Sequence, residues 1–503
     1  VSTRLFDYSG RGLTSKRSKV IPRTRPFLMY RTHDRLKSIF YRSIPMLRRS
    51  WMEARASTSR RKLSTSPAIS TWFREVQEAA KRSISEGKRS GKSKGRYGGG
   101  ELVRDFIGAE LYAEDRGYFN ATNCINTPRE PLEFTKMSGL EEYQAHVKQL
   151  YYDGIEGWAT PVEIFQPWYG QALARWIVGA RQPSDGEELI IFELGAGNGT
   201  LARNILDYLQ QELPSVYSTT RYITVDVSSR LAQIQAEKLN SHSDITATIN
   251  TPASGLDEII PKLRDKTVFV LGMEVLDNMP HDKIFFDSKS GETFQTHVVS
   301  DPTGHPYPYV EQLHPVKDPY IVRLANILSS IPEDISRGGS YSTPSTSQGG
   351  GIGMLEWARM AIDDMFEIFI PRNEAFLPSV CSMSMESIAR CLPKHRIILA
   401  DFAYLPDTIS PALNSPVVSQ KIVESEQMRG RSRDFDTYLI PQGQADIFFP
   451  TDFYFLEQMY KDVMSRARPD SPGVTVAGSL THGAFFEAYA DLPRLTTSNG
   501  DIP

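Results

Sequence analysis

The sequence predicts an α/β protein built on a largely parallel, doubly wound sheet, and three observations support this fold class. Four short apolar runs recur along the chain, amphipathic stretches follow several of them, and the first run leads into a glycine-rich turn. Strands that are apolar throughout are typical of a parallel sheet with helices on both faces. Ligands of such sheets bind at the carboxyl ends of the strands.

The predicted strands are the runs LIIFEL (189–194), YITVDV (222–227), TVFVLG (267–272) and RIILAD (396–401). A helix is expected after the first strand, ending near Leu213, and another after the second strand, with Ser228 or Ser229 as its N-cap. Apolar residues at helical spacing also predict helices over about 102–117 and 160–180.

These patterns divide the chain into seven segments. We expect a targeting segment over 1–63, a basic flexible linker over 64–100, an N-terminal helical region over 101–180, the first part of the sheet domain over 181–335, a low-complexity insertion over 336–352, the second part of the sheet domain over 353–470 and a C-terminal tail over 471–503. The insertion is rich in Ser, Gly and Pro, so it has too few apolar residues to form a core.

Charge is distributed unevenly, although the net charge is only −3. Residues 1–70 carry 17 Lys and Arg against Asp7, Asp34 and Glu53, and the chain beyond residue 100 is acidic. An Arg-rich, Ser-rich and nearly acid-free segment is typical of a mitochondrial presequence, so we expect a location in the mitochondrial matrix. The alternative is a disordered basic tail that binds RNA or anionic lipid. The acidic body argues against nucleic acid as its main partner.

Cysteine and histidine spacing indicates neither a disulfide framework nor a metal site. The three cysteines include no C-x-x-C pair, and the nine histidines show no H-E-x-x-H or similar spacing. No run of about 20 apolar residues suggests a membrane-spanning helix. Reduced, metal-free chemistry is therefore the expectation.

The glycine-rich turn follows the first predicted strand in ELGAGNGTL. Thr200 stands where the dinucleotide fingerprint G-x-G-x-x-G needs its third glycine, and no lysine follows as in a phosphate-binding loop. The turn instead fits acid-x-Gly-x-Gly-x-Gly, a pattern of S-adenosylmethionine (SAM)-dependent methyltransferases. SAM carries a sulfonium and an ammonium group, so Glu193 is expected to hold its amino-acid end. Gly195, Gly197 and Gly199 would let the backbone approach the cofactor.

Two further strand ends carry acids. Asp226 ends the second strand, where a carboxylate would accept hydrogen bonds from both ribose hydroxyls of SAM. Glu274 and Asp277 follow the third strand and would lie near the transferred methyl group. The simpler interpretation of Glu274 and Asp277 is a helix N-cap and a solvated loop acid.

The combined motifs resemble the MidA-like family of SAM-dependent methyltransferases, which includes the mitochondrial protein arginine methyltransferase that acts as a complex I assembly factor. That family shows E-L-G-P-G-x-G-T-L, V-E-x-S-x-x-L-x-x-Q and N/H-E-F-F-D-x-L-P. This chain has ELGAGNGTL (193–201), VDVSSRLAQIQ (225–235) and MEVLDNMP (273–280). Similar segments at 160–177, 398–406 and 443–456 extend the resemblance over about 101–460.

The resemblance implies a Rossmann-like SAM-dependent methyltransferase fold with an N-terminal helical region and insertions. It implies SAM as cofactor and an arginine-containing protein segment, such as part of a respiratory-complex subunit, as substrate. Glu274 would then clamp the guanidinium group, with Asp277 as a second carboxylate. The chain departs from the family pattern at Ala196, Asn198, Met273, Val275 and Leu276.

These departures leave alternatives open, because the substrate-side motif is altered more than the cofactor-side motif. One alternative is a non-catalytic assembly factor that uses the fold to bind a partner, and another is a small-molecule methyltransferase. A nicotinamide oxidoreductase is disfavoured by Thr200. The sequence indicates no oligomeric state.

Overall fold

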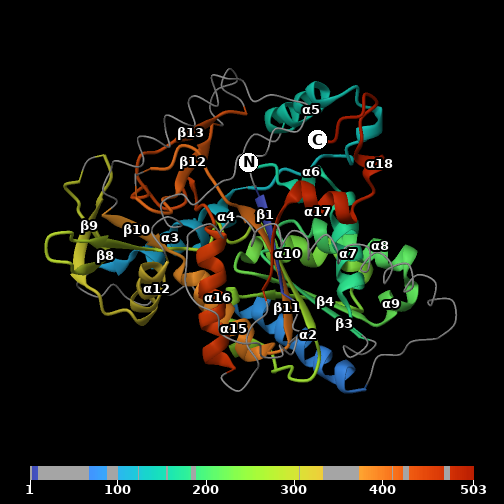
Figure 1. Cartoon of the computed structure of the whole chain (residues 1–503), viewed down its shortest axis with the longest axis horizontal. Coiled ribbons are helices and arrows are strands. Elements are labelled where there is room, and N and C mark those ends of the chain that lie inside the picture. Colours follow the sequence, from blue (N-terminus) through green and yellow to red (C-terminus); the bar gives the residue numbers. More distant parts are fainter. Residues whose placement is uncertain are drawn as a thin grey trace, which may run out of the picture.

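A seven-stranded sheet runs through the centre of the computed structural model, in the order β15-β1-β11-β6-β3-β4-β5 (Figure 1). Five neighbouring strands are parallel: β11 (His395–Phe402), β6 (Val268–Met273), β3 (Leu189–Leu194), β4 (Thr220–Asp226) and β5 (Thr246–Asn250). β1 (Thr3–Tyr8) runs antiparallel to β11 and to β15 (Val476–Thr481). The predicted sheet is therefore confirmed, and each of the four predicted strands is present.

The structure describes part of the chain. The described residues are 3–8, 67–87, 100–122, 124–153, 157–182, 188–304, 306–331, 373–409, 412–422, 430–468 and 476–503. The predicted insertion over 336–352 lies outside these ranges.

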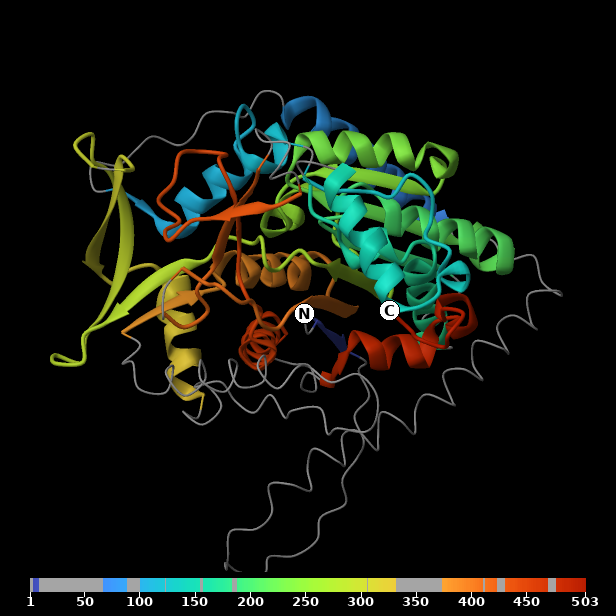
Figure 2. The same ribbon diagram turned by 90° about the horizontal axis from the view of Figure 1, so that it is seen from above.

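Helices cover both faces of the sheet (Figure 2). Alternate residues of β3 supply the two cores: Ile190 and Phe192 belong to one hydrophobic cluster, and Leu189 and Ile191 to the other. The first cluster includes α2 (Pro67–Gly87), α11 (Leu256–Ile259), α12 (Pro319–Ser330), α15 (Ser379–Cys391) and α16 (Phe453–Ala467). The second includes α7 (Trp168–Ala180), α8 (Thr200–Glu212), α9 (Pro214–Ser218) and α17 (His482–Tyr489). The sheet is thus doubly wound, as the apolar strands predict.

Two smaller antiparallel sheets complete the fold, and the sequence analysis predicts neither. The first has the order β10-β7-β8-β2, with β9 also paired to β8: β10 (Glu374–Leu377), β7 (Asp282–Phe286), β8 (Thr293–Ser300), β2 (Glu101–Leu102) and β9 (Tyr309–Pro315). The second has the order β13-β12-β14: β13 (Ser432–Asp434), β12 (Val417–Lys421) and β14 (Asp446–Phe448). In Figure 2 the sheet with β8 and β9 stands at the end of the molecule away from α8.

The N-terminal helical region consists of several short helices. They are α3 (Val103–Tyr112), α4 (Tyr118–Ala121), the 3₁₀ turn η1 (Phe134–Lys136), α5 (Leu140–Asp153) and α6 (Pro161–Ile164), followed by α7. The single helix expected over 160–180 is in fact two, and Pro167 stands at the N-cap of the second. Proline lacks the backbone N–H that a continuous helix needs. The remaining elements are α10 (Ser229–Lys238), η3 (Asn240–His242), η4 (Ala253–Gly255) and α18 (Leu492–Leu495).

Two segment predictions are wrong in part. The flexible linker expected over 64–100 contains the 21-residue helix α2, whose Trp72, Phe73 and Val76 are buried against the sheet. The tail expected over 471–503 contains β15, α17 and α18, and Phe485 of α17 is buried. In both segments a few apolar residues at the right spacing outweigh a polar composition, because burying them stabilises the local helix.

The targeting segment expected over 1–63 includes β1, which the sheet pairs on both sides. Its role in targeting stays a prediction. None of the described helices is long and apolar enough to cross a membrane.

The order of the parallel strands reverses between β3 and β6, and we call the region beyond the carboxyl ends of these two strands the crevice. From β3 the chain proceeds outward through β4 and β5, then returns to the other side of β3 to form β6 and β11. Helices that follow two such strands lie on opposite faces, and ligands of such sheets bind beyond the carboxyl ends of these strands. The glycine-rich turn and Glu274 begin at these two strand ends.

Candidate active site

The glycine-rich turn after β3 has a backbone that side chains would not tolerate. Gly195, Gly197 and Gly199 have φ angles of 61°, 52° and 75°, in the left-handed region that favours glycine. A Cβ atom on Gly195 would lie 2.3 Å from Cγ2 of Val275. The turn therefore lies directly against the residue that follows Glu274, so the ends of β3 and β6 lie close together.

A segment of the N-terminal region covers this turn; we call Tyr118–Thr127 the cover segment, of which Asn123 is not described. The Asn198 side-chain amide donates to the Ile125 carbonyl at 3.3 Å and to the Thr127 hydroxyl at 3.0 Å. Ser228 and Arg230, at the start of α10, donate to the carbonyls of Phe119 and Thr122 respectively. The sequence predicts only that this segment belongs to the N-terminal helical region over 101–180.

Asp226 lies at the end of β4 as predicted, but its carboxylate is buried and already bonded. It accepts the backbone N–H of Ser228 at 2.9 Å and the side-chain amide of Gln235 at 2.7 Å. The same Gln235 amide donates to the Gly197 carbonyl at 3.0 Å, so it ties the turn to β4. Burial raises the pKa of Asp226 to about 6. Gln235 is a site residue that the sequence analysis does not single out, although the second motif ends on it.

Glu193 is 3% exposed and accepts a hydrogen bond of 2.7 Å from the Tyr222 hydroxyl. Burial raises the pKa of Glu193 to about 8, and the nearby carboxylates of Asp226 and Glu163 contribute to the increase. Glu163, from α6, is also buried and accepts a hydrogen bond of 3.0 Å from the Thr200 hydroxyl. Three buried carboxyl groups thus surround the start of the glycine turn, and Glu163 is the one that the sequence analysis misses.

Glu274 begins the turn after β6 in an unusual conformation. Its φ angle is 51°, and its backbone N–H extends the sheet by donating to the Ala400 carbonyl at 2.7 Å. A non-glycine residue in this region costs about 1–3 kcal/mol and persists only where the surroundings impose it. Atom Oε1 of Glu274 is buried and has no hydrogen-bond partner within the described part of the protein. Burial and the charge of Asp401 raise the pKa of Glu274 well above its usual range.

Asp401, at the end of β11, holds the Glu274 turn in place. Its Oδ2 atom accepts the backbone N–H groups of Leu276 at 2.8 Å and Asp277 at 3.1 Å. Its pKa is raised to about 7 by burial. Any strand can end in an acid, so the run RIILAD alone does not reveal this role.

Asp277 is 5% exposed, so its interpretation as a solvated loop acid is wrong. Burial raises its pKa well above the usual range, and the charges of Asp401, Asp446 and Glu274 add to the effect. The neighbouring Asn278 amide donates to Asp446 at 2.8 Å. Four carboxyl groups, from Glu274, Asp277, Asp401 and Asp446, therefore gather beyond β6 and β11, and we call them the acidic cluster.

Several departures from the family pattern have structural roles. The Met273 sulfur accepts a hydrogen bond of 3.4 Å from the buried Tyr169 hydroxyl, which also pairs with His482 of α17 at 2.7 Å. Val275 fills the space over Gly195, and Asn198 fastens the cover segment. The substrate-side motif is thus repacked around these side chains.

The donor set fits SAM. Its sulfonium and ammonium groups are positive, and carboxyl groups that can pair with a cation follow both β3 and β6. The Oε1 atom of Gln235 is buried without a partner in the described residues, next to Asp226, where the ribose hydroxyls are expected. The glycine turn leaves the adjoining backbone free of side chains.

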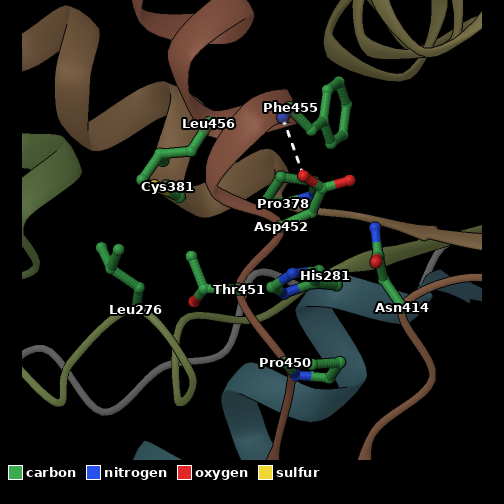
Figure 3. A pocket seen from close by; sticks show the side chains of 10 residues that line it. All are labelled: Leu276, His281, Pro378, Cys381, Asn414, Pro450, Thr451, Asp452, Phe455 and Leu456. Atoms are coloured by element: carbon green, nitrogen blue, oxygen red, sulfur yellow. Dashed lines mark hydrogen bonds between the residues drawn. The ribbon is translucent and has the colours of Figure 1, made fainter. Parts of the chain in front are cut away.

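A separate small pocket lies behind the Glu274 turn, and Figure 3 shows its lining. Its wall includes Leu276, His281 and Cys381 but none of the predicted site residues. The His281 ring stacks on Phe449, with ring centroids 3.9 Å apart. This pocket contains neither the glycine turn nor the acidic cluster, so we assign it no part in cofactor binding. The described residues contain no group of three His, Cys, Asp or Glu side chains arranged to hold a metal ion.

Comparison with solved structures finds proteins of similar architecture at low identity. A Burkholderia thailandensis protein bound to S-adenosyl-homocysteine, described as a candidate methyl transferase, is 16% identical, with a TM-score of 0.44 over 81% of this chain and 80% of its own. A second, uncharacterised protein from Burkholderia thailandensis is 14% identical, with a TM-score of 0.39 over 80% and 79% of the two chains. No curated protein gives a significant match.

The family assignment comes from a family model. The model described as "Putative S-adenosyl-L-methionine-dependent methyltransferase" matches residues 172–469, which include both strand ends of the crevice. SAM is the cofactor of this family, and the residues of the glycine turn fit it. The chain therefore belongs to this MidA-like family of S-adenosyl-L-methionine-dependent methyltransferases.

Proposed function

We propose that this methyltransferase acts on an arginine nitrogen of a protein substrate, with Glu274 and Asp277 as the clamp for the guanidinium group. The acidic cluster carries the proposal. Three buried carboxyl groups and that of the half-buried Glu274 share one region, and the buried Oε1 atom of Glu274 has no hydrogen-bond partner among the described residues. A guanidinium group presents five N–H donors in a planar fork and stays positively charged, so it satisfies two carboxylates at once.

The raised pKa values of the acidic cluster apply to the site when no cation is bound. Carboxyl groups that are buried near one another hold protons, because several negative charges repel in a medium of low polarity. A guanidinium group between Glu274 and Asp277 lowers their pKa values and forms charge-assisted hydrogen bonds with both. Substrate binding is therefore expected to release protons from the acidic cluster.

The clamp would also supply the chemistry that arginine needs. SAM, when bound, supplies a methyl group on a positive sulfur whose departure leaves a neutral thioether. Glu274 orients one guanidinium nitrogen toward that methyl group and accepts the proton that this nitrogen loses as its N–C bond forms. Placing the reacting atoms in line accounts for most of the expected acceleration. Asp401 positions Glu274 through the backbone of the turn.

The decisive experiment separates cofactor binding from transfer. We expect Glu274→Gln to bind SAM with an affinity within about three-fold of the wild type and to lose at least about 100-fold in methyl transfer. Calorimetry measures the first quantity, and transfer of labelled methyl groups to a mitochondrial protein extract measures the second. Equal loss of both would assign Glu274 to cofactor binding. A wild-type protein that binds SAM but labels no protein would favour the non-catalytic assembly factor or the small-molecule methyltransferase.

We further propose that the protein acts in the mitochondrial matrix on a respiratory-complex subunit. The basic segment over residues 1–63 and the resemblance to the mitochondrial members of the family support this location. A fluorescent fusion at the C-terminus should co-localise with a matrix marker, and a fusion that stays in the cytosol would contradict the proposal. N-terminal sequencing of the mature protein would show whether β1 is retained, because removal of the segment leaves β11 without its antiparallel neighbour.

A further inference from the structure

A lysine ammonium group lies between two aromatic rings beside the proposed substrate region. The Nζ atom of Lys421, on β12, is 3.7 Å from the centre of the Trp158 ring and 4.4 Å from that of Tyr151 on α5. The Lys421 side chain is buried, with only 8% of the residue exposed. Cations bind to the faces of aromatic rings, and sites made of such rings recognise quaternary ammonium ligands. We call Tyr151 and Trp158 the aromatic cage.

The cage adjoins both halves of the active site. Trp158 pairs through its backbone with Ile125 of the cover segment, the residue that faces Gly197. Its ring packs edge-on against Phe448 of β14, two residues after Asp446 of the acidic cluster. Tyr151 lies near enough to Glu274 for the charge of that carboxylate to affect the pKa of the Tyr151 hydroxyl. The cage therefore stands between the cover segment and the acidic cluster.

Burial at this position is unfavourable for the charged form of Lys421. Burial lowers the pKa of its ammonium group to about 8, and the charge of Asp434 on β13 only partly offsets that effect. Asp434 is exposed. The carboxylate whose charge attracts the Lys421 ammonium group therefore lies at the surface, whereas the ammonium group is buried against the rings.

We propose that the aromatic cage is a cation-binding subsite for a basic side chain of the substrate, and that Lys421 occupies it until the substrate displaces the lysine. The ligand class is an ammonium or guanidinium group on a peptide. The inference rests on the proposed function in that the cation is taken to come from a protein substrate. The cage gives specificity for a basic residue near the methylated arginine, and Lys421 weakens the binding of peptides that lack one.

The test measures binding of a simple cation to full-length protein. We expect Lys421→Met to bind tetramethylammonium about ten-fold more tightly than the wild type, because a neutral thioether competes for the ring faces less strongly than an ammonium group does. Isothermal titration with tetramethylammonium chloride, against sodium chloride at equal ionic strength, gives the affinities. Lys421→Arg keeps a cation in the cage and should behave as the wild type. Lys461→Met, a change at a lysine on α16 that pairs with Glu457, is the matched control and should also behave as the wild type.

A second change identifies the cage as the binding site. Tyr151→Leu in the Lys421→Met background should remove the gained affinity, and thermal denaturation with SAM titration verifies that each variant is folded. Equal tetramethylammonium affinities in the wild type and Lys421→Met, or a gain that survives Tyr151→Leu, would overturn the inference. SAM binding and methyl transfer by the wild type are measured separately, so failure of the cage leaves the proposed function standing.

Discussion

The acids on the two sides of the crevice differ in their hydrogen bonding. On the cofactor side, Asp226 and Glu193 receive hydrogen bonds from Gln235, Ser228 and Tyr222, so the carboxyl groups hold the structure together. On the substrate side, Glu274 has a strained backbone, and its Oε1 atom has no partner among the described residues. The two carboxyl groups on the cofactor side are hydrogen-bonded before a ligand binds. On the substrate side, a carboxyl oxygen lacks a hydrogen-bond partner that a cation would supply. The following changes test this difference, from the largest expected effect to the smallest.

The largest effect is expected from Gly195→Ala. The new Cβ would lie 2.3 Å from Cγ2 of Val275, a branched and stiff side chain, in a backbone conformation that itself costs about 1–2 kcal/mol for alanine. We expect SAM affinity to fall at least about 100-fold, as measured by calorimetry. Gly291→Ala is the matched control, because Gly291 has a φ of 72° but no atom within 4 Å of the added Cβ. Unchanged SAM binding in Gly195→Ala would show that the turn does not contact the cofactor.

The second effect concerns the support of the acidic cluster. Asp401→Ala leaves the backbone N–H groups of Leu276 and Asp277 without their acceptor, at a cost of about 1–3 kcal/mol for each buried group. We expect methyl transfer to fall more than SAM affinity, in steady-state kinetics and calorimetry on the same sample. Asp452→Ala removes a carboxylate that likewise accepts two backbone N–H groups, at the start of α16, and should lower stability without this selective loss. If methyl transfer and SAM affinity fall by the same factor in Asp401→Ala, as expected for Asp452→Ala, Asp401 has only a structural role.

The third effect is a pH dependence of stability from the cofactor side. The pKa of Glu193 is about 8 in the folded protein and near 4.5 when exposed, so the folded state binds the proton more tightly. Its contribution is fully present below pH 4.5 and is lost as pH rises through 8, by at most about 1.4 kcal/mol per pH unit. Glu193→Gln keeps an acceptor for Tyr222 and removes the titration. In denaturant unfolding between pH 5 and 9, the free energy of unfolding of the variant should increase relative to that of the wild type as pH rises.

A control and a contrary outcome complete this test. Glu237→Gln changes an exposed carboxylate on α10 and should follow the wild type at every pH. A constant difference between Glu193→Gln and the wild type would mean that Glu193 is ionised in the folded state. Its proposed contact with the ammonium group of SAM would then need no loss of a proton.

The smallest effect is expected at the cover segment. Asn198→Ala removes the hydrogen bonds to the Ile125 carbonyl and the Thr127 hydroxyl, each worth about 0.5–1.5 kcal/mol. We expect SAM to dissociate about three- to ten-fold faster, as measured by stopped-flow fluorescence. Gln149→Ala, which removes an exposed hydrogen bond within α5, should leave the rate unchanged. An unchanged rate in Asn198→Ala would show that the cover segment does not retain the cofactor.

The sequence predicts the cofactor side far better than the rest, for identifiable reasons. The strands β3, β4, β6 and β11 are continuous apolar runs, and three alternating glycines after an acid mark a turn whose backbone conformation other residues rarely adopt. Helix α2 escapes prediction because the charged residues around Trp72 and Val76 obscure their helical spacing. The antiparallel sheet of β7, β8 and β9 mixes buried and exposed positions, and it depends on pairing between distant residues.

The substrate side could be located from sequence but not described. Their position after β6 predicts that Glu274 and Asp277 lie near the transferred methyl group, and this role stays a prediction. The parts played by Asp401, Glu163 and the aromatic cage depend on contacts between segments that are far apart in the chain. Nothing in the local pattern distinguishes a strand-end acid that supports a turn from one that faces solvent. Side-chain contacts therefore had to come from the fold.

The measurement that tests the account most directly is calorimetry of SAM against the full-length protein and its Gly197→Val variant. Valine at Gly197 places a branched side chain at a φ of 52°, facing Ile125 of the cover segment. We expect micromolar binding by the wild type, in the range of about −8 kcal/mol, and its loss in the folded variant. Equal binding by both proteins, or none by a folded wild type, would contradict the placement of the cofactor at the glycine turn.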